Sequence, residues 1–382
     1  MIQKTMKSEK NQVSNNAVMY FGTYEKNYPR NRIMIKGLQR NNVEVIECHQ
    51  ALWEKSEDKT GKFFKSKTKI ILNLLKGYNE LIKKYKKSKK SNTIIVGYPG
   101  QFDMILIRLL APRKKIIFNP MISMYDTIVL DRKLFKKKSI PAKLTMMLDQ
   151  LSCKLANIVI LDTPEHARYF KKELKVNKKK LRVVPVGADD DIFKPLEKKD
   201  NNEINILFYG KFTPIHGVEY ILKTAKIFNE NPKIKFTIIG KGQTHKKILE
   251  LYEKLKINNI KFIDWIPYNE LPQEINKSDI CLGGHFGLGA KAGRVIPNKT
   301  FQMIAMKKPV IISDSLASIE GSFVDNKNSI FCKQGSVKEL VNKINILIKN
   351  KTLSDEISQN GYNLYKEKYS ISAIGKKTKN II

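Results

Sequence analysis

Short runs rich in β-branched and aromatic residues alternate along the chain with longer segments in which apolar residues recur every three or four positions. The short runs predict buried strands and the longer segments predict amphipathic helices, an alternation typical of βαβ units built on parallel sheets. In the first half, the predicted strands cover residues 18–22, 43–48, 93–98, 115–119, 158–161 and 182–186.

This alternation is interrupted once, where residues 187–202 turn polar and acidic, and it then resumes. A chain of 382 residues suits two domains better than one. We therefore expect a first domain at 1–187, a linker at 188–202, a second domain at 203–365, and a C-terminal helix at 366–382 that returns to the first domain. The predicted strands of the second half are 204–210, 234–240, 260–264, 279–284, 309–313 and 329–332.

Each half opens with a predicted strand that ends in glycine, at Gly22 and at Gly210. Ligands of open parallel sheets bind beyond the carboxyl ends of the strands. The expected fold is therefore α/β, with two doubly wound Rossmann-like domains that face each other across a cleft, and both glycine loops should border that cleft.

A glycine-rich loop at 283–293 leads into a predicted helix that starts near Pro297. Proline suits the first turn of a helix, where its missing N–H costs nothing. The free N–H groups of Asn298, Lys299 and Thr300 then point toward whatever lies before the helix, and an anion there meets the positive end of the helix dipole. The segment predicts a phosphate site, although a plain loop connection would use the same glycines.

Two further loops at the same predicted edge carry basic residues beside glycine. One follows the strand 204–210 and the other follows the strand 234–240. A lysine and a histidine before a helix suit a diphosphate, whereas a lone loop histidine is more often only solvated. The residues in question are Gly210, Lys211, His216 and Gly217 in the first loop, and Gly240, Lys241 and Gly242 in the second.

The chain carries 71 basic and 36 acidic residues, a formal charge of +35, and the first 200 residues hold 43 of the basic and 20 of the acidic ones. Such an excess attracts nucleic acid, anionic lipid or phosphorylated small molecules, and a lysine-rich solvated surface is the plain alternative. The basic runs contain few aromatic residues and no nucleic-acid motif occurs, so we expect no specific nucleic-acid partner.

The four cysteines, Cys48, Cys153, Cys281 and Cys332, are far apart and show no metal-ligand spacing. They are interpreted as reduced core residues of a cytoplasmic protein. No apolar run reaches about 18 residues, and no hydrophobic signal segment is found at the start. Peripheral attachment to the inner face of a membrane through basic segments is the remaining expectation for contact with lipid.

The second half resembles the nucleotide-sugar-binding half of family 4 glycosyltransferases, which have the GT-B fold. The resemblance is carried in order by the loop around His216, by IIGKGQ, by FIDWIPYNELPQEINKSDICL and by VIPNKTFQMIAMKKPVIIS. It implies that Trp265 and Ile266 flank the nucleobase, and that the helix after Pro297 meets the ribose and the diphosphate.

The chain departs from the hallmark of that family, two glutamates separated by seven residues. Alignment on Pro297 places Arg294 at the first position and Gln302 at the second. Gln302 can still bond ribose hydroxyls, but Arg294 cannot replace a carboxylate. Arg294 could instead bind the diphosphate or an acidic donor sugar, or could indicate a noncatalytic relative.

The first half resembles, more weakly, the acceptor domain of such enzymes. Its opening loop places Arg30 as a candidate clamp for an acceptor phosphate or carboxylate, with packing on a tyrosine as the equal alternative. Many relatives carry a histidine after the strand 115–119, where this chain offers Asp126 as a candidate acceptor of the hydroxyl proton or as a helix cap. The candidate acceptor-binding residues are Gly22, Thr23, Tyr24, Arg30, Asn31, Ser123 and Tyr125.

The resemblance implies a retaining glycosyltransferase that moves a sugar from a nucleoside diphosphate sugar to an acceptor hydroxyl in surface glycan or glycolipid synthesis. The expected partners are the donor, a glycan or lipid-linked acceptor, and an anionic membrane surface. No bound metal and no cofactor are expected, since basic groups and a helix dipole can neutralise the leaving diphosphate. The alternatives are a nucleotide-sugar epimerase on the same fold and an inactive donor-binding subunit.

Overall fold

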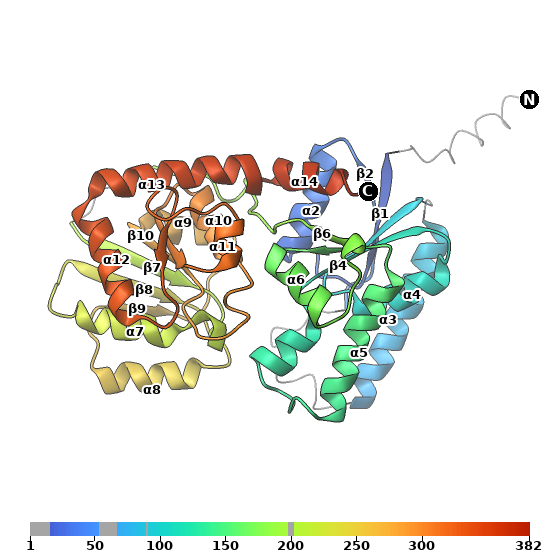
Figure 1. Ribbon diagram of the computed structural model, residues 1–382, viewed down its shortest axis with the longest axis horizontal. Coiled ribbons are helices and arrows are strands. Elements are labelled where there is room, and N and C mark those ends of the chain that lie inside the picture. Colours follow the sequence, from blue (N-terminus) through green and yellow to red (C-terminus); the bar gives the residue numbers. More distant parts are fainter. Residues whose placement is uncertain (1–15, 53–66, 89–90, 198–201) are drawn as a thin grey trace, which may run out of the picture.

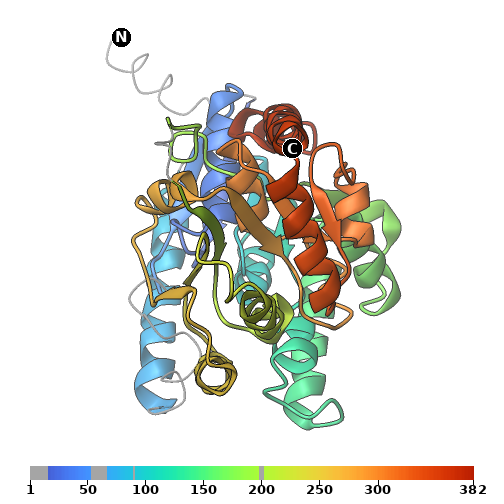
Figure 2. The ribbon, with the colours of Figure 1, turned by 90° about the vertical axis from the view of Figure 1, so that its left-hand side faces the viewer.

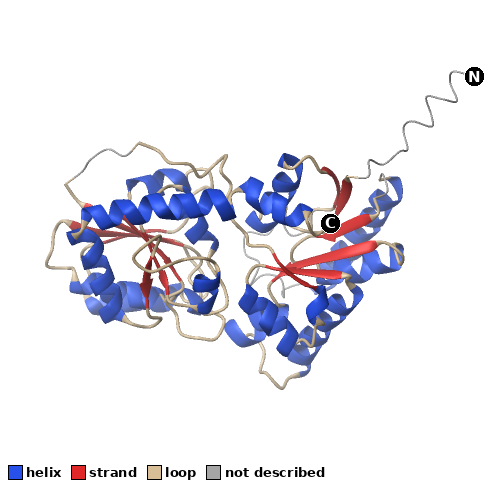
Figure 3. Cartoon of the chain, turned by 45° about the horizontal axis from the view of Figure 1, so that its top comes forward, coloured by secondary structure: helices blue, strands red, loops and turns tan. Residues whose placement is uncertain are grey.

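The computed structural model describes residues 16–52, 67–88, 91–197 and 202–382. They form two six-stranded parallel sheets with helices on both faces of each (Figures 1 and 3). This architecture confirms the predicted pair of doubly wound α/β domains. Figure 2 views the molecule from the side of the second domain, whose sheet lies between helices.

The first sheet has the strand order β2-β1-β3-β4-β5-β6. The order reverses direction at β1, which lies between β2 and β3, so a crevice is expected beyond the carboxyl end of β1. The strands are β1 (Ala17–Gly22), β2 (Glu44–His49), β3 (Thr93–Val96), β4 (Lys115–Met121), β5 (Ile158–Leu161) and β6 (Leu181–Val183). The helices are α2 (Pro29–Arg40), α3 (Lys67–Lys87), α4 (Gln101–Leu110), η3 (Asp126–Asp131), α5 (Ile140–Leu155), α6 (Pro164–Lys172) and η4 (Lys178–Lys180).

The second sheet repeats this plan with the order β12-β11-β10-β7-β8-β9. The strands are β7 (Ile204–Tyr209), β8 (Ile234–Ile239), β9 (Ile260–Ile263), β10 (Ile280–Gly284), β11 (Val310–Ser313) and β12 (Ile330–Cys332). The helices are η5 (Pro214–His216), α7 (Val218–Ile227), α8 (His245–Leu255), α9 (Leu271–Lys277), α10 (Asn298–Ala305), α11 (Leu316–Glu320), α12 (Val337–Lys349), α13 (Lys351–Leu364), η6 (Tyr365–Tyr369) and α14 (Ile371–Lys379).

Most predicted strands match the observed ones within a residue or two, because central parallel strands are buried on both faces and read as continuous apolar runs. The run predicted at 182–186 forms a shorter strand, Leu181–Val183. Pro185 has no N–H to donate to a ladder, so pairing stops before it. Val184 and Val186 remain buried in the core beyond the end of the strand.

The last helix packs on the first domain. In Figure 1, α13 runs along the second domain and α14 continues beside α2. The two helices approach through Gly37 and Gly375, since a Cβ on Gly375 would lie 1.9 Å from the carbonyl oxygen of Gly37. A side chain at either glycine would therefore force α14 away from α2.

Candidate active site

Three basic side chains meet at the carboxyl ends of β7 and β10 in the second domain. Lys299, in the first turn of α10, places its Nζ 3.3 Å from Nδ1 of His216, which ends the short helix η5 after β7. The ring of His285, directly after β10, lies 5.0 Å from the ring of His216. Lys299, His216 and His285 are called the basic cluster below.

No acidic side chain among the described residues pairs with the basic cluster. Burial alone lowers the pKa of Lys299 well below its usual value. Burial, with the nearby Lys299 charge, also lowers the pKa of both histidines well below the ordinary value. A bound anion would raise the pKa of all three groups, and no anionic side chain among the described residues is placed to do so. A group of buried basic side chains that lacks a negative partner is typical of a phosphate site.

Glycine makes room for the basic cluster. Gly210, with φ of 147°, presents bare backbone to it, and a Cβ there would lie 3.4 Å from Nζ of Lys299 and 3.6 Å from Nε2 of His216. Gly217 has φ of 62° and lies so close to Gly287 that a Cβ would come within 2.3 Å of the Gly287 nitrogen. The two loops that carry His216 and His285 are thus packed backbone to backbone.

The structure brings Lys299, His216 and Gly210 together as predicted neighbours, and it adds His285, which the sequence analysis missed. A lone histidine between glycine and phenylalanine has no motif to mark it. The position of His285 directly after a predicted strand could have indicated a site residue. The carboxyl end of β10 adjoins the carboxyl end of β7 in the sheet, where ligands bind.

The other predicted donor-side residues lie around this cluster in different ways. Gly240 and Gly242 pack on the first loop, since Cβ atoms would lie 2.0 Å from the Gly210 oxygen and 2.7 Å from the Phe212 oxygen. Lys241 is half exposed and pairs with Asp264. Lys211 and Trp265 are exposed, Ile266 is partly buried, and Pro297 and Asn298 begin α10. Their contacts with a donor stay predictions.

Gln302 is held between two tyrosines. Its Oε1 accepts a hydrogen bond of 2.8 Å from the Tyr209 hydroxyl, and its Nε2 donates one of 3.0 Å to the Tyr268 hydroxyl. The guanidinium of Arg32, from the first domain, stacks 4.5 Å above the Tyr268 ring. Both ends of the Gln302 amide are thus occupied within the protein, and a ribose contact of Gln302, still a prediction, requires one of these bonds to open.

The glycine-rich loop is tied to the first domain by two ion pairs. Nη2 of Arg294 donates to Oδ1 of Asp126 at 2.6 Å, and Nζ of Lys291 lies 3.2 Å from Oδ2 of Asp131. Both carboxylates belong to η3, a π-helical turn that follows β4. The Arg294 guanidinium also lies 4.5 Å above the ring of Tyr169 on α6.

Asp126 is therefore not a simple helix cap, because it forms a buried cross-domain ion pair. Its second oxygen, Oδ2, is buried and has no partner among the described residues. Ser123 and the backbone of Tyr125 instead bond Asp149, with distances of 2.7 and 2.9 Å to its Oδ2. The Arg294 guanidinium is already paired with Asp126, so an acidic donor sugar would have to compete with Asp126 for this guanidinium.

The predicted acceptor clamp lies deeper than a surface clamp would. Arg30 is buried, with Nε donating 2.7 Å to Asn119 and Nη1 donating 3.1 Å to the Pro185 carbonyl. Its Nη2 is buried without a partner among the described residues, so an acceptor contact, still a prediction, would use that nitrogen. Asn31 bonds Tyr20 and the backbone of Tyr98.

The first glycine loop rests on a buried acid. The Thr23 backbone N–H and hydroxyl donate to Asp103 Oδ2 at 2.8 and 3.1 Å, and a Cβ on Gly22 would lie 2.4 Å from the same oxygen. Tyr24 is buried and donates 2.8 Å to Glu47. Gly22, Thr23 and Tyr24 therefore shape the cleft from below, and their contact with an acceptor stays a prediction.

Asp103 gives a pH-dependent prediction. Burial raises its pKa to about 6, so the folded protein holds this proton more tightly than the unfolded chain does. The resulting stabilisation is fully present below the unfolded pKa of about 4 and is lost as the pH rises through 6. Relative to the Asp103→Asn variant, the free energy of unfolding of the wild type should fall by up to about 3 kcal/mol between pH 4 and pH 7.5. Urea unfolding at both pH values measures this, and parallel curves for the two proteins would contradict it.

Among the described residues, one group of acidic side chains has carboxylate oxygens close enough together to hold a metal ion, within 4.8 Å of one another. The group consists of Asp189, Asp190 and Asp191. Its carboxylates already bond cations of α2. Asp189 pairs with Arg32 and Lys36, both at 3.0 Å, and Asp191 pairs with Lys36 at 2.8 Å. These pairs fasten the chain between the domains to α2 and account for the cluster without a metal.

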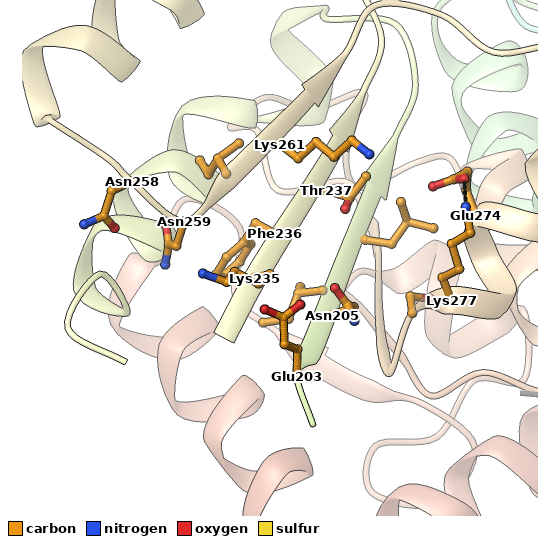
Figure 4. A pocket seen from close by; sticks show the side chains of 14 residues that line it. Glu203, Asn205, Lys235, Phe236, Thr237, Asn258, Asn259, Lys261, Glu274 and Lys277 are labelled. Carbon is orange, nitrogen blue, oxygen red and sulfur yellow. Dashed lines mark hydrogen bonds and ion pairs between the residues drawn. The ribbon is translucent and has the colours of Figure 1, made fainter. Parts of the chain in front are cut away.

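A hollow of about 440 Å³ lies elsewhere, at the amino ends of β7, β8 and β9 (Figure 4). Glu203, Asn205, Lys235 and Lys261 are among its lining residues. It is at the opposite edge of the sheet from Gly210 and the basic cluster. Because ligands of open parallel sheets bind at the carboxyl edge, we do not assign the donor to this hollow.

Residues 189–364 match the family model described as glycosyl transferases group 1. The chain is 26% identical over 227 residues to an uncharacterized 41.2 kDa protein in the cps region of Klebsiella pneumoniae, which covers 55% of this chain and 58% of that protein. It is 24% identical over 188 residues to the uncharacterized glycosyltransferase MJ1059 of Methanocaldococcus jannaschii, covering 47% of this chain and 45% of that one. The chain thus matches about half the length of these curated relatives.

Solved structures show the same fold. Sucrose-phosphate synthase from Thermosynechococcus elongatus superposes with a TM-score of 0.72 at 13% identity and covers 96% of this chain and 98% of its own. HepE of Anabaena, in complex with UDP-glucose, superposes with a TM-score of 0.69 at 12% identity and covers 96% and 99%. At such identities the likeness concerns the fold alone.

Proposed function

We propose that the chain transfers a sugar from a nucleoside diphosphate sugar to an acceptor hydroxyl, because residues 189–364 match the family model described as glycosyl transferases group 1. The observation that carries this proposal is the basic cluster, in which Lys299, His216 and His285 converge at the carboxyl edge of the second sheet with no carboxylate partner among the described residues. A leaving diphosphate would supply the missing negative charge.

In the proposed reaction, the bond between the anomeric carbon and the diphosphate oxygen breaks, and the acceptor oxygen bonds to that carbon. Negative charge then develops on the diphosphate, where Lys299 and the start of α10 would stabilise it. This stabilisation needs no metal. Retention of the anomeric configuration is part of the proposal and rests on the family resemblance.

Asp126 is proposed as the carboxylate that faces the reacting sugar from the first domain. It belongs to the turn after β4, and its Oδ2 is buried and unbonded among the described residues. This oxygen could accept the proton of the acceptor hydroxyl or stabilise positive charge on the sugar ring. Arg294 would position the carboxylate through the bond to Oδ1.

The proposed acceptor is a growing surface glycan or a lipid-linked sugar. We propose that the protein is cytoplasmic and meets this acceptor at the membrane surface. The similarity to a protein in the cps region of Klebsiella pneumoniae supports a role in polysaccharide synthesis. The basic first half of the chain supports an anionic surface as the place where the acceptor is met.

An inactive donor-binding subunit is the second candidate. Arg294 and Gln302, at the positions of the family glutamates, already have partners within the protein, and this favours the second candidate. Arg294 pairs with Asp126, and Gln302 bonds two tyrosines. This candidate predicts donor binding without transfer or donor hydrolysis.

A thermal-shift panel tests the proposed donor. UDP-, GDP- and CMP-linked sugars and the free nucleotides are added to the protein, with the matching nucleosides as controls that lack phosphate. A ligand of the folded state raises the unfolding midpoint by mass action, so one nucleotide family should raise it and its nucleoside should raise it much less. No shift at several millimolar from any nucleotide would overturn the proposal.

A further inference from the structure

Four apolar side chains form a stripe along the outer face of α5. Ile140, Leu144, Met147 and Leu151 follow one another at intervals of four, three and four residues, which places them on one side of a helix. They are between 43 and 73% exposed, although the opposite face of α5 is buried through residues such as Ala142 and Cys153. An apolar stripe of this length on the solvent side of a helix lacks a partner within the described chain.

The neighbouring helix α4 also carries exposed apolar side chains. It is joined to α5 by the bond of 3.2 Å from Gln101 to Asp149 and by the bond of 3.0 Å from Ser152 to the Gln101 carbonyl. Its Phe102 and Leu109, two turns apart, are 54 and 75% exposed. Helices α4 and α5 lie together at the outer edge of the first domain (Figure 1). Their exposed side chains constitute what we call the α4–α5 face.

Exposed lysines flank this apolar surface before α5 and along the helix. Lys136, Lys137 and Lys138 are exposed immediately before α5, and Lys143 and Lys154 are exposed on the helix itself. The single acidic residue from 132 to 155 is Asp149, which is buried and bonded to Ser123. Exposed apolar groups edged by lysines match the two layers of an anionic bilayer, with hydrocarbon below the level of the phosphates.

We propose that the α4–α5 face docks the protein on an anionic lipid bilayer. A second copy of the chain is a poor occupant, because a two-fold contact would bring two lysine-rich faces of the same sign of charge together. No described helix is long and apolar enough to cross a bilayer, so attachment through this part of the chain is peripheral.

The position of the α4–α5 face rests on the proposed function and extends it. Helix α5 begins nine residues after η3, the turn that carries Asp126 and Asp131 at the cleft. A bilayer held against the start of α5 lies next to the entrance of the acceptor side. The acceptor class that this arrangement fits is a sugar carried on a lipid.

Co-sedimentation with vesicles tests the docking face. We expect the full chain to bind vesicles of 70% phosphatidylcholine and 30% phosphatidylglycerol and to dissociate from them at 0.5 M NaCl. Most of the protein should stay unbound with vesicles of phosphatidylcholine only. The double variant Leu144→Gln/Met147→Gln should bind on the order of 10-fold more weakly. The triple variant of Lys136, Lys137 and Lys138 to Gln should bind on the order of 100-fold more weakly, since each lysine near an anionic surface contributes about one factor of five.

Matched controls change the same residue types in the second domain. Ile227→Gln/Leu249→Gln removes two exposed apolar residues from α7 and α8, and Lys246→Gln/Lys247→Gln removes two exposed lysines from α8. Both controls should bind vesicles as the wild type does. Equal loss in controls and test variants, or binding unaffected by the changes on α5, would overturn the proposal.

Two further readouts separate this proposal from its rivals. A wild-type dimer in light scattering that Leu144→Gln/Met147→Gln converts to a monomer, without any vesicle binding, would assign the face to a second copy. Vesicle binding needs no donor, and the thermal shift with nucleotides should be the same in the wild type and in the α5 variants. Loss of one signal with retention of the other therefore shows which proposal has failed.

Discussion

Replacing Lys299 by methionine is expected to weaken nucleotide-sugar binding by about 10- to 100-fold while leaving the unliganded protein at least as stable as the wild type. The loss follows from removal of a charge-assisted bond to the diphosphate, which is worth about 1.5–3 kcal/mol. The retained stability follows from burial, which lowers the pKa of this lysine well below its usual value, with no acid beside it among the described residues. Methionine fills a similar volume without a charge to desolvate.

The stacking of Nζ at 3.8 Å over the Phe208 ring offsets part of the burial cost, so the gain in stability should be small, at about 1 kcal/mol or less. Calorimetric titration with the nucleotide that gives a thermal shift measures the change in Kd, and urea unfolding measures the stability. Lys246→Met is the matched control, because Lys246 is exposed on α8 of the same domain. Donor binding unchanged by Lys299→Met would remove the basic cluster from the donor site.

The same titration carries a proton signature. A bound diphosphate raises the pKa of Lys299, His216 and His285, which burial holds down in the free protein. Binding near pH 7 should therefore take up protons, and the measured enthalpy should vary with the ionisation enthalpy of the buffer. Lys299→Met should reduce this uptake.

Breaking the Asp126–Arg294 pair from one side is expected to destabilise the protein by about 3–5 kcal/mol, because a buried charge then remains without its partner. Asp126 is fully buried and the Arg294 side chain is 14% exposed, with 2.6 Å between Oδ1 and Nη2. The double variant Asp126→Asn/Arg294→Met should lose less than the sum of the single variants, and the cycle gives the coupling energy from urea unfolding. Arg168→Met serves as the control, since the exposed pair with Glu320 on α11 also joins the domains but should contribute less than about 1 kcal/mol.

Transfer activity divides the roles of this pair. If Asp126 acts on the acceptor or the sugar ring, Asp126→Asn should lower the rate of transfer by about 100-fold or more at saturating donor, with nucleotide binding retained. A variant that transfers at the wild-type rate would make Asp126 a strut between the domains and nothing more. Donor binding with neither transfer nor hydrolysis in the wild type would support the inactive subunit instead.

The parts of the site that the sequence predicted best are those set by local geometry. Gly210 and Lys299 each follow or begin an element at the carboxyl edge of one sheet, so their meeting follows from the βαβ rule once the strands are placed. His285 obeys the same rule but carries no motif. Arg30 was less predictable, because burial among Asn119 and the carbonyls before the linker depends on how α2 packs across the sheet.

The contact between Asp126 and Arg294 joins residues 168 positions apart and in different domains. Nothing in either local sequence specifies a partner at that distance, since the pairing depends on how the two sheets are held by the linker and by α14 against α2. The locking of Gln302 between Tyr209 and Tyr268 is of the same kind, because the three residues come from β7, the segment after β9 and α10.

The sequence by itself determined two parallel α/β domains and their family likeness, because strand and helix periodicity and glycine at strand ends are local properties of the chain. Only the tertiary structure decided which charges meet. It gathered Lys299, His216 and His285 with no described acidic residue beside them, and it paired Arg294 with Asp126 of the other domain. The physical reason is that the pKa of a group and the energy of its interactions depend on burial and on neighbours from distant elements. Both are fixed only when the two sheets have packed together.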